Sequence, residues 1–358
     1  MSQEILEIDG ATMEGGGQIL RNAIAFSALL KKPIRVFNIR AGRSNPGLRP
    51  QHLAGLLLAK DLTSGRLKGG KVGSTEISFY PGDIQGKKYY ADPGTAGSVM
   101  LLFQVAFPCL LFADAKSEMN LRGGTNADMA PQIDEVLMVF KPIMEKFGAK
   151  FECEIIKRGY FPKGGGEVDF FIEPCAPHLK PVEILDVGNV TGIEGRSYVG
   201  GVLSLKMSHG MADSACRYLG NAFPGVNIKI DRVKEPDEMV IGIGSGIVLM
   251  AKTDTGCLIG GASLGKRGVS VDDVGEKAAK ELEKEIKSSA CVDSHVQDQL
   301  VIFMALAKGK SRIRIGPPTL HTKTAIWVAE LMTEAKFNII EDGKTMIMEC
   351  EGIGFERR

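Results

Sequence analysis

Apolar residues recur along this chain at two spacings, and segments of the two kinds follow one another in a repeated order. Between Ile133 and Phe147 the apolar positions return every three or four residues, which predicts an amphipathic helix ended by a glycine. Residues 336–350 instead alternate between apolar and polar side chains on both sides of Asp342-Gly343, a pair that favours a tight turn between two strands. The chain is therefore predicted to mix helices and strands.

Three segments share the same order of a helix, a strand, a second helix and a hairpin. They cover residues 17–82, 96–174 and 298–350. A helix pair beside a small sheet leaves apolar faces that one unit cannot cover alone, so three such layers are expected to bury one another's faces. The pattern predicts an α+β fold, mixed α/β in character, built from three repeated units in a pseudo-threefold arrangement.

The order of elements changes between about residues 184 and 288. Strands are predicted near 183–190, 196–205, 226–233 and 246–253, and helices near 212–223 and 271–289. We predict that residues 184–288 form a small α+β domain inserted between the second and third units, so that residues 1–183 and 289–358 make up the larger domain. The Glu/Lys run at 281–287 is predicted to be a solvated helix face.

Polar residues stand at equivalent points of the three units. In each unit the central strand leads through a short polar loop to the second helix. The residues at or near those helix starts are Gln51, His52, Pro131, Gln132 and His321. If the units are related by a pseudo-threefold axis, equivalent loops approach one another. We therefore predict that these side chains meet in one cleft.

Composition and charge are those of a globular protein with sizeable cores. The 358 residues suffice for two or three domains, and 44% of them are apolar against 24% charged. A net charge of +1 does not imply a general attraction to nucleic acid, so such a contact would need a local basic patch. No apolar run is long enough for a membrane span, and the acidic start MSQEILEIDG lacks the regions of a secretion signal, which predicts an intracellular protein without a membrane partner.

Several features that suggest other chemistry lack the context they need. The seven cysteines are scattered without a CxxC pair, which predicts reduced thiols and neither a disulfide framework nor a zinc site. GIGSG at 242–246 runs into a predicted strand and not a helix, so it does not fit a dinucleotide-binding turn. KTDTG at 252–256 has one residue too many for the lysine motif of covalent nucleotidyl transferases.

The segment MEGGGQILR, residues 13–21, suits phosphate binding. Its glycines let the backbone approach a ligand closely, although a tight turn without function stays the alternative. It is not a Walker A loop, because GxxxxGK[ST] occurs nowhere in the chain. Glu14 is a candidate ligand for a divalent metal. The arginines in this segment and the loop that follows are Arg21, Arg40, Arg43 and Arg49. Because guanidinium groups bind phosphate oxygens with a planar set of donors, we predict an anion site here.

His321 differs from the other histidines because it opens a predicted helix after PPTL, with Thr322 and Thr324 beside it. Backbone N–H groups and the positive end of the helix dipole would face a phosphate at this place. A neutral imidazole there can attack phosphorus and form a labile phosphoramidate. A capping or surface histidine is the alternative, and both readings stay open from the residues alone.

Polar side chains in apolar surroundings mark a second candidate region. Gln104 lies in an otherwise almost wholly apolar helix, and a buried amide needs a partner, either a base edge or a backbone carbonyl. Asp298 and Gln299 open the first helix of the third unit, with His295 one turn earlier. Helix capping by Asp298 and contact with a nucleotide are the two readings of this arrangement.

Taken together, several segments resemble the RNA 3'-terminal phosphate cyclase family, and animal members of it most closely. They are EGGGQILR, IRAGRSNPGLRPQHL, GGTNADMAPQ, RGYFPKGGGEV, SLGKRGV, DQLVIFMALA and TLHTKTA, and they keep their order over nearly the whole chain. The resemblance implies three βαβαββ-type units and a smaller inserted α+β domain. It also implies that the larger domain is similar to enolpyruvyl transferases.

The resemblance implies a reaction as well. It is the ATP-dependent conversion of an RNA 3'-terminal phosphate to a 2',3'-cyclic phosphate, through a histidyl-AMP enzyme and an RNA-3'-pp-adenosine intermediate. ATP is the adenylyl donor, Mg²⁺ or Mn²⁺ assists, and the partner is RNA with a 3'-phosphate end. No obligate protein partner is evident, and similarity to animal relatives implies a place in the nucleus.

By the same resemblance, His321 in TLHTKTA is the residue that becomes adenylated. The positions that match the polar cluster for metal, phosphates and the RNA end are Glu14, as the metal ligand, Arg21, Arg43, Gln51 and His52. Those that match the adenosine site are Gln104, Pro131, Asp298, Gln299 and His295. His295 departs from the tyrosine that the family commonly stacks on adenine, so weaker ATP binding or an altered nucleotide preference is expected.

Two other classes of protein stay open at this point. A non-catalytic, cyclase-like ribosome-assembly protein would share the fold, but such members lack the adenylated histidine, whereas this chain keeps His321 in its motif. An enolpyruvyl transferase would turn over phosphoenolpyruvate. Release of pyrophosphate from ATP separates both from a cyclase.

Overall fold

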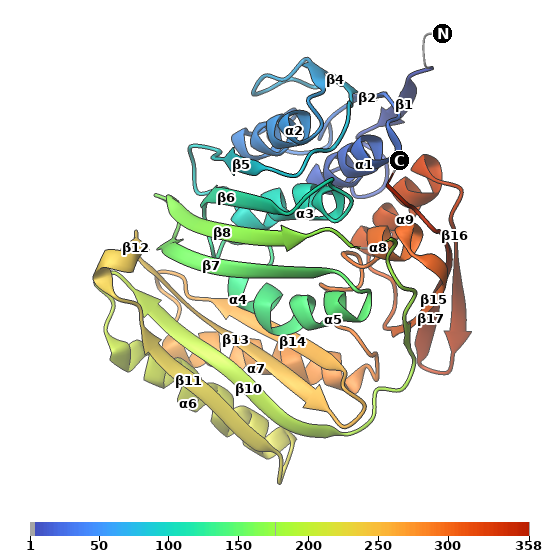
Figure 1. Cartoon of the computed structure of the whole chain (residues 1–358). Coiled ribbons are helices and arrows are strands. Elements are labelled where there is room, and N and C mark those ends of the chain that lie inside the picture. Colours follow the sequence, from blue (N-terminus) through green and yellow to red (C-terminus); the bar gives the residue numbers. More distant parts are fainter. Residues whose placement is uncertain (1–3, 176, 358) are drawn as a thin grey trace.

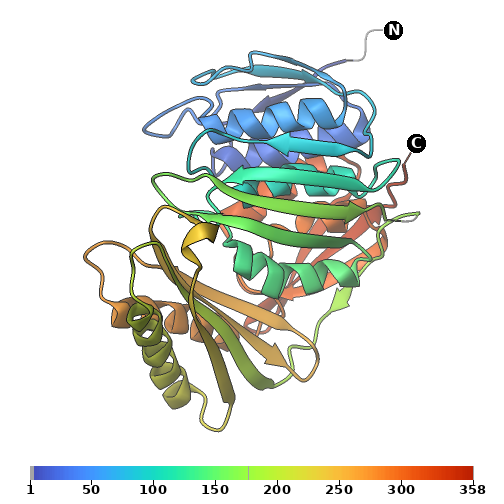
Figure 2. The same cartoon turned by 60° about the vertical axis from the view of Figure 1, so that its left-hand side comes forward.

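The computed structural model describes residues 4–175 and 177–357. It is a mixed α/β protein, and the described residues form four sheets (Figure 1). The first unit, in blue, lies on the second, in teal to green, and the third, in orange to red, lies beside them (Figure 2). No helix of the described chain combines the length and the apolar character needed to cross a membrane.

Three units of the chain repeat the order βαβαββ. The first consists of β1 (Leu6–Asp9), α1 (Gly17–Leu30), β2 (Ile34–Phe37), α2 (Pro50–Leu62), β3 (Arg66–Lys68) and β4 (Ile77–Tyr80). The second consists of β5 (Lys88–Ala91), α3 (Val99–Leu110), β6 (Ser117–Gly123), the helical segment α4 (Ile133–Glu135), η1 (Val136–Phe140) and α5 (Lys141–Lys146), then β7 (Lys150–Gly159) and β8 (Gly166–Glu173). The third consists of β9 (Glu183–Ile184), α8 (Val301–Leu306), β15 (Lys308–Ile315), α9 (Leu320–Met332), β16 (Lys336–Asp342) and β17 (Thr345–Ile353).

The sheets of the three units have the same topology. In each, the first strand pairs parallel with the second, the second pairs antiparallel with the fourth, and the fourth pairs antiparallel with the third. The orders are β1-β2-β4-β3, β5-β6-β8-β7 and β9-β15-β17-β16, with β12 (Val240–Ile241) added at the edge of the second. This shared order confirms the repeat that the hydrophobic pattern predicted.

Residues between β9 and α8 form a separate sheet with its own helices. Its elements are β10 (Val190–Gly200), α6 (Leu205–Ala222), β11 (Asn227–Lys234), the 3-10 turn η2 (Asp237–Met239), β13 (Gly244–Thr253), β14 (Leu258–Leu264) and α7 (Val271–Lys287). The order of the sheet is β11-β10-β13-β14. In β13, Ile247 and Leu249 belong to the core under α6 and α7, while Met250 belongs to the core of the repeated units. Burial on both faces explains the unbroken apolar run of this strand.

The insertion begins inside the third unit and not before it. Glu183 and Ile184 pair with Arg312 and Ile313 of β15, so these two residues belong to the sheet of the third unit. The sequence pattern placed residue 184 in the inserted domain because a two-residue strand carries no periodicity of its own. The domain boundaries at 184 and 288 otherwise stay a prediction.

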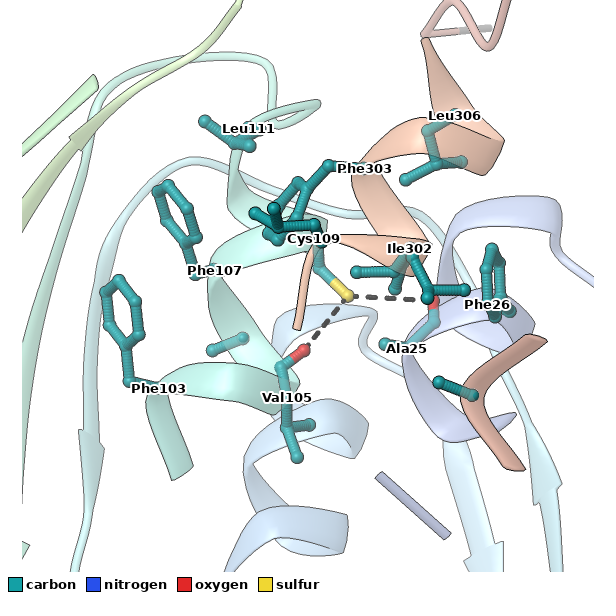
Figure 3. Close-up of a cluster of buried hydrophobic side chains, with 14 of the residues drawn as sticks. Ala25, Phe26, Phe103, Val105, Phe107, Cys109, Leu111, Ile302, Phe303 and Leu306 are labelled. Carbon is teal, nitrogen blue, oxygen red and sulfur yellow. Dashed lines mark hydrogen bonds between the residues drawn. The ribbon is translucent and has the colours of Figure 1, made fainter. Parts of the chain in front are cut away.

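The first helices of the three units meet in the centre of the core (Figure 3). Phe107 of α3 packs against Phe303 of α8, with ring centroids 5.7 Å apart, and against Phe103 one turn earlier at 4.7 Å. The Cys109 thiol lies between α3 and α1 and donates to the backbone oxygens of Val105, at 3.4 Å, and Ala25, at 3.8 Å. These contacts hold the three units together. The starts of their helices, away from these contacts, therefore keep fixed positions relative to one another.

Some predicted elements differ in detail. The helix from Ile133 contains a π-helical turn, because Pro142 has no N–H to donate and the Lys141 N–H bonds to Val136 instead. The central strand of the first unit, β2, ends at Phe37. Beyond it, Asn38 and Arg40 take left-handed backbone conformations that no strand contains. The hairpin predicted at Asp342-Gly343 is confirmed, with its turn at Gly343-Lys344.

Replacing Phe107 by alanine is expected to lower the free energy of unfolding by about 3–5 kcal/mol, because it opens a cavity among rings from two units. Urea unfolding followed by circular dichroism measures the change. The matched control is Phe161→Ala, because Phe161 is 78% exposed and its loss should cost less than about 0.5 kcal/mol. Similar losses for both variants would contradict the central position of Phe107.

Candidate active site

One large cleft, of about 1360 Å³, lies where the starts of several helices face the insertion. Its near wall consists of the glycine-rich segment before α1, the start of α2, the loop before α4 and the start of α9. Its far wall consists of β14 and α7 of the insertion. The cleft therefore collects side chains from all three units and from the inserted segment.

Glycines at the start of α1 let side chains crowd around the backbone. Gly15 has a φ of +60°, and a Cβ on Gly17 would lie 2.5 Å from Nε2 of His52. A side chain at Gly17 would therefore displace His52 from the cleft. The carboxylate of Glu14 lies against Gly16 and forms an ion pair with Arg43. These glycines allow Glu14 and His52 to lie against the backbone, and its close approach to a ligand stays a prediction.

Two donors near these glycines point into the cleft without a protein acceptor. His52 accepts a hydrogen bond at Nδ1 from the backbone N–H of Arg49, at 3.1 Å, so its proton is on Nε2. Burial, and then the positive charges of Arg21 and two further arginines, lower the pKa of His52 to about 4, which keeps the ring neutral. Burial lowers the pKa of Arg21 to about 10, so its guanidinium stays charged, and it lines the cleft. Unpaired donors of this kind suit a bound anion.

His321 is held by a relay of two hydrogen bonds at the start of α9. Gln18, buried in the first turn of α1, donates from Nε2 to the carboxylate of Asp298. Its Oε1 therefore faces Nδ1 of His321, at 3.1 Å. Burial raises the pKa of Asp298 to about 6, so the carboxylate is still ionised and accepting at neutral pH. Since an amide oxygen can only accept, this contact favours the tautomer of His321 with the proton on Nδ1 and a free lone pair on Nε2.

A second polar group lies between α3 and α7. Gln104 donates to Oε1 of Gln299 at 3.1 Å, and Gln299 donates to the backbone oxygen of His295 at 2.7 Å. The ring of His295 bonds to Glu281 of α7 at 2.7 Å. This hydrogen bond, with further charge from Glu135, raises the pKa of His295 to about 9. The ring is therefore an imidazolium at neutral pH.

A family model described as RNA 3'-terminal phosphate cyclase matches residues 12–339. The chain is 40% identical over 352 residues to the RNA 3'-terminal phosphate cyclase of Pyrobaculum aerophilum, with 98% of this chain and 99% of the relative covered. The chain belongs to the RNA 3'-terminal phosphate cyclase family. The RNA 3'-terminal phosphate cyclase of Drosophila melanogaster is 36% identical over 354 residues, with 99% of this chain and 98% of the relative covered.

The relatives within the cyclase family do not single out animals. The probable RNA 3'-terminal phosphate cyclase of Dictyostelium discoideum is 40% identical over 360 residues, with 98% of this chain and 83% of the relative covered. The relatives at 36–40% identity thus come from archaea, a slime mould and a fly, and a particular closeness to animal members stays a prediction.

Among solved structures, the enolpyruvyl transferase NikO from Streptomyces tendae matches 48% of this chain and 33% of its own, at 16% identity and a TM-score of 0.29. A score this low does not establish a shared fold. The similarity to enolpyruvyl transferases stays a prediction.

The structure brings together nearly all of the site residues that the family resemblance implied. Those that line the cleft are Glu14, Arg21, Arg43, His52, Gln104, Pro131, His295, Asp298, Gln299 and His321. Gln51 does not line it, because its side chain turns to accept a hydrogen bond from the backbone N–H of Ser98 at 2.9 Å. Arg40 lines the cleft but Arg49 does not, so three of the four arginines predicted for an anion site lie in the cleft.

Several cleft residues were missed by the sequence pattern. Gln18 directly follows the third glycine of the motif, and a glutamine at the head of an apolar helix was the available signal. Glu281 and Lys284 line the cleft, which the prediction of a solvated face at 281–287 did not include, while Lys284 and Lys287 are exposed as that prediction expects. Glu285 in the same run is buried and accepts from the hydroxyl and backbone N–H of Ser294. The alternating charges of α7 give the same sequence pattern whether the charged face contacts solvent or protein.

A divalent cation fits the carboxylate of Glu14. Oε2 of Glu14 is buried and has no hydrogen-bond partner among residues 4–175 and 177–357, while Oε1 binds Arg43. A buried carboxylate oxygen without a partner is costly unless a cation meets it. The described residues contain no group of three or more histidine, cysteine or acidic ligands that could hold a metal. Further ligands would therefore be phosphate oxygens and water, as is usual for Mg²⁺.

Replacing Glu281 by glutamine is expected to lower the pKa of His295 from about 9 toward 6.5, because the ring loses its charged partner. Proton NMR of the imidazole, assigned by its loss in His295→Asn, follows the titration. Because the folded pKa is raised, the stabilisation by this pair is complete below about pH 6.5 and is lost as the pH rises through about 9.

The matched control is Glu276→Gln, which removes a neighbouring acid of α7 that pairs with Lys280 and not with His295. It should leave the titration unchanged. An unaltered His295 curve in Glu281→Gln would contradict the pairing across the cleft.

Proposed function

We propose that this chain uses ATP to convert RNA 3'-terminal phosphates to 2',3'-cyclic phosphates, through an adenylated His321. Membership of the cyclase family over residues 12–339 supports the overall reaction. The observation that carries the covalent step is the relay from Asp298 through Gln18 to Nδ1 of His321. It leaves a lone pair on Nε2 at the mouth of a cleft whose other side chains suit phosphates.

In the first step, Nε2 of His321 attacks the α-phosphorus of ATP, a P–N bond forms, and pyrophosphate leaves. The proton on Nδ1 stays with the ring, and Gln18 stabilises the positive charge that develops as Nε2 bonds to phosphorus. A neutral histidine with the proton on Nε2 would have no lone pair there. Gln18 therefore acts as a positioning residue that selects the reactive tautomer.

Charge on the phosphoryl oxygens is met by groups of the near wall. Arg21 and the Nε2–H of His52 are donors without protein acceptors, and the backbone N–H groups at the start of α1 lie beside them. Fixed donors of this kind stabilise charge that grows in the transition state. A divalent cation held by Glu14 would supply further positive charge to the phosphates.

The nucleoside end is assigned to the group formed by Gln104, Gln299 and His295, with Pro131 on the loop opposite. The imidazolium of His295 can lie against the face of adenine as a cation beside a π system. The His295 ring has a smaller surface than the tyrosine common in the family, but it adds a positive charge to the contact. This arrangement supports ATP as the adenylyl donor.

In the second step, the RNA 3'-phosphate attacks the adenylyl phosphorus and the P–N bond to His321 breaks. In the third, the neighbouring 2'-hydroxyl attacks the RNA phosphorus, AMP leaves and the hydroxyl proton is released. The last step needs little from the protein, because a tethered nucleophile reaches effective molarities of about 10⁵–10⁸ M. Most of the catalytic demand therefore falls on the first step, where Gln18 and the arginines act.

A non-catalytic, cyclase-like role is the second candidate, and the ordered environment of His321 disfavours it. A protein that does not form the covalent bond would not need a buried glutamine that fixes one tautomer of His321. Placement in the nucleus rests only on resemblance and stays a prediction.

Incubated with ATP labelled at the α-phosphate, the protein is expected to acquire label that is labile to acid and stable to alkali, as a phosphoramidate is. His321→Ala should acquire none. The control is His178→Ala, since His178 lies outside the cleft and its loss should leave the labelling unchanged. Label that persists in His321→Ala would move the nucleophile elsewhere.

Substitutions of Gln18 test the relay. Gln18→Leu is expected to slow adenylation by about 10–100-fold, the range typical of partners that orient a histidine. Gln18→Glu keeps the shape and the acceptor but adds a negative charge, which favours the imidazolium and should move the pH profile of adenylation to higher pH. Single-turnover rates across a pH series measure both effects. Unchanged rates and profiles in both variants would exclude a role for Gln18.

A further inference from the structure

Helix α7 of the insertion turns a row of lysines toward the cleft. Lys277, Lys280 and Lys284 line the cleft together with Lys266 from the loop after β14, and we call these four residues the lysine face. Residues three and four apart on a helix lie about 5–6 Å apart at their Cβ atoms, so the three helix lysines form a continuous row. The acidic residues of α7 do not neutralise this row evenly.

Two members of the lysine face have no ion-pair partner among the described residues. Lys280 pairs with Glu276 at 2.6 Å, and Lys266 pairs with Asp128 at 2.8 Å. Glu281, which lies between the lysines, is engaged by His295 instead. Lys277 and Lys284 form no ion pair with a described residue, although Lys277 contributes, after Lys266, to the lowered pKa of Asp128. The far wall therefore carries two lysines that are available to an anion.

The lysine face stands opposite the groups assigned to the reacting phosphates. Arg21, Arg43 and His52 belong to the near wall, formed by the repeated units, whereas the lysines belong to the far wall. The cleft volume of about 1360 Å³ exceeds the roughly 300–1,000 Å³ of usual small-molecule sites. A nucleoside triphosphate at the near wall would leave the far wall free for a second substrate.

An exposed apolar side chain extends the same surface. Met129 lines the cleft beside the Asp128–Lys266 ion pair, and 90% of it is exposed. Unpaired bases offer flat apolar faces for such a contact, while their phosphates suit lysines, which bind without demanding one geometry. These features together fit a single strand with repeated negative charges.

We propose that the lysine face binds the phosphates of the RNA strand upstream of its 3' end, so that the insertion acts as an RNA-binding module. The proposal rests on the proposed function and adds the path of the RNA. It separates the roles of the cleft surfaces: the near wall carries the phosphates of ATP and the terminal phosphate, the nucleoside lies beside His295, and the lysine face carries the preceding nucleotides. Binding of the β- and γ-phosphates of ATP by the lysines is the competing assignment.

The test uses the double variant Lys277→Ala/Lys284→Ala, which removes the two unpaired lysines. Substrates are a dinucleotide with a 3'-phosphate and a single strand of about 12 nucleotides with the same end. The KM for the longer RNA should rise, whereas the KM for the dinucleotide should not. The slope of log affinity against log salt should become shallower by about 1.4, because each lost phosphate contact in a single strand contributes about 0.7.

The matched control is Lys287→Ala, a lysine of the same helix that pairs with Glu283 and does not line the cleft. It should leave both KM values unchanged. An equal KM for the longer RNA in the double variant and the parent protein would overturn the proposal. A raised KM for ATP in the labelling of His321 would overturn it too, and would assign the lysines to the nucleotide. Failure of the parent protein to acquire label would instead refute the proposed function, and the salt slope of RNA binding would still decide the role of the lysines.

Discussion

The buried guanidinium of Arg158 is the group on which the cleft depends, because it ties the insertion to the second unit. It binds both carboxylate oxygens of Asp134 in α4, at 2.7 and 2.8 Å, and Glu235 after β11, at 2.9 Å. Arg196 of β10 adds a second bond to Glu235 at 2.7 Å. Burial alone would raise the pKa of Asp134, but the charge and hydrogen bonds of Arg158, with Arg196 and Asn126, together outweigh burial and lower the pKa. Moving each charge out of water costs several kcal/mol, so buried charges need partners of opposite sign. This pairing fixes the position of the insertion relative to the second unit.

The same network sets the loop that carries part of the near wall. Asn126 donates to Asp134 at 3.0 Å and to Gln132 at 3.1 Å, and the hydroxyl of Tyr198 in the insertion donates to Gln132 at 2.8 Å. Pro131 and Met129, which line the cleft, lie within this loop. The near wall and the far wall are therefore positioned by one set of hydrogen bonds. The distance across the cleft follows from the interface and not from either domain alone.

Much of the fold was predictable, because helices and hairpins carry their own periodicity. The opening strands β1, β5 and β9 have four residues or fewer. Each pairs parallel with a strand that follows a crossover helix, and such a distant pairing leaves no local pattern in the sequence. In the site, His52 and His321 could be placed by the repeat, since both stand at equivalent helix starts. Gln18 could not, because it meets Asp298 across 280 positions of the chain. Glu281 could not either, because an amphipathic helix has the same pattern whether its polar face meets solvent or a cleft.

Three histidines in one cleft are held in three different states, and their surroundings alone set the difference. Nδ1 of His321 donates to Gln18, so Nε2 offers a lone pair, as a nucleophile must. Nδ1 of His52 accepts from a backbone N–H, so Nε2 offers a proton, as a phosphate donor must. His295 meets a carboxylate and keeps both protons, as a cation against a base requires. The chemistry of each ring is thus decided by the atom that its neighbour presents, and neighbours so far apart in the chain are brought together only by the three-unit core and the interface around Arg158.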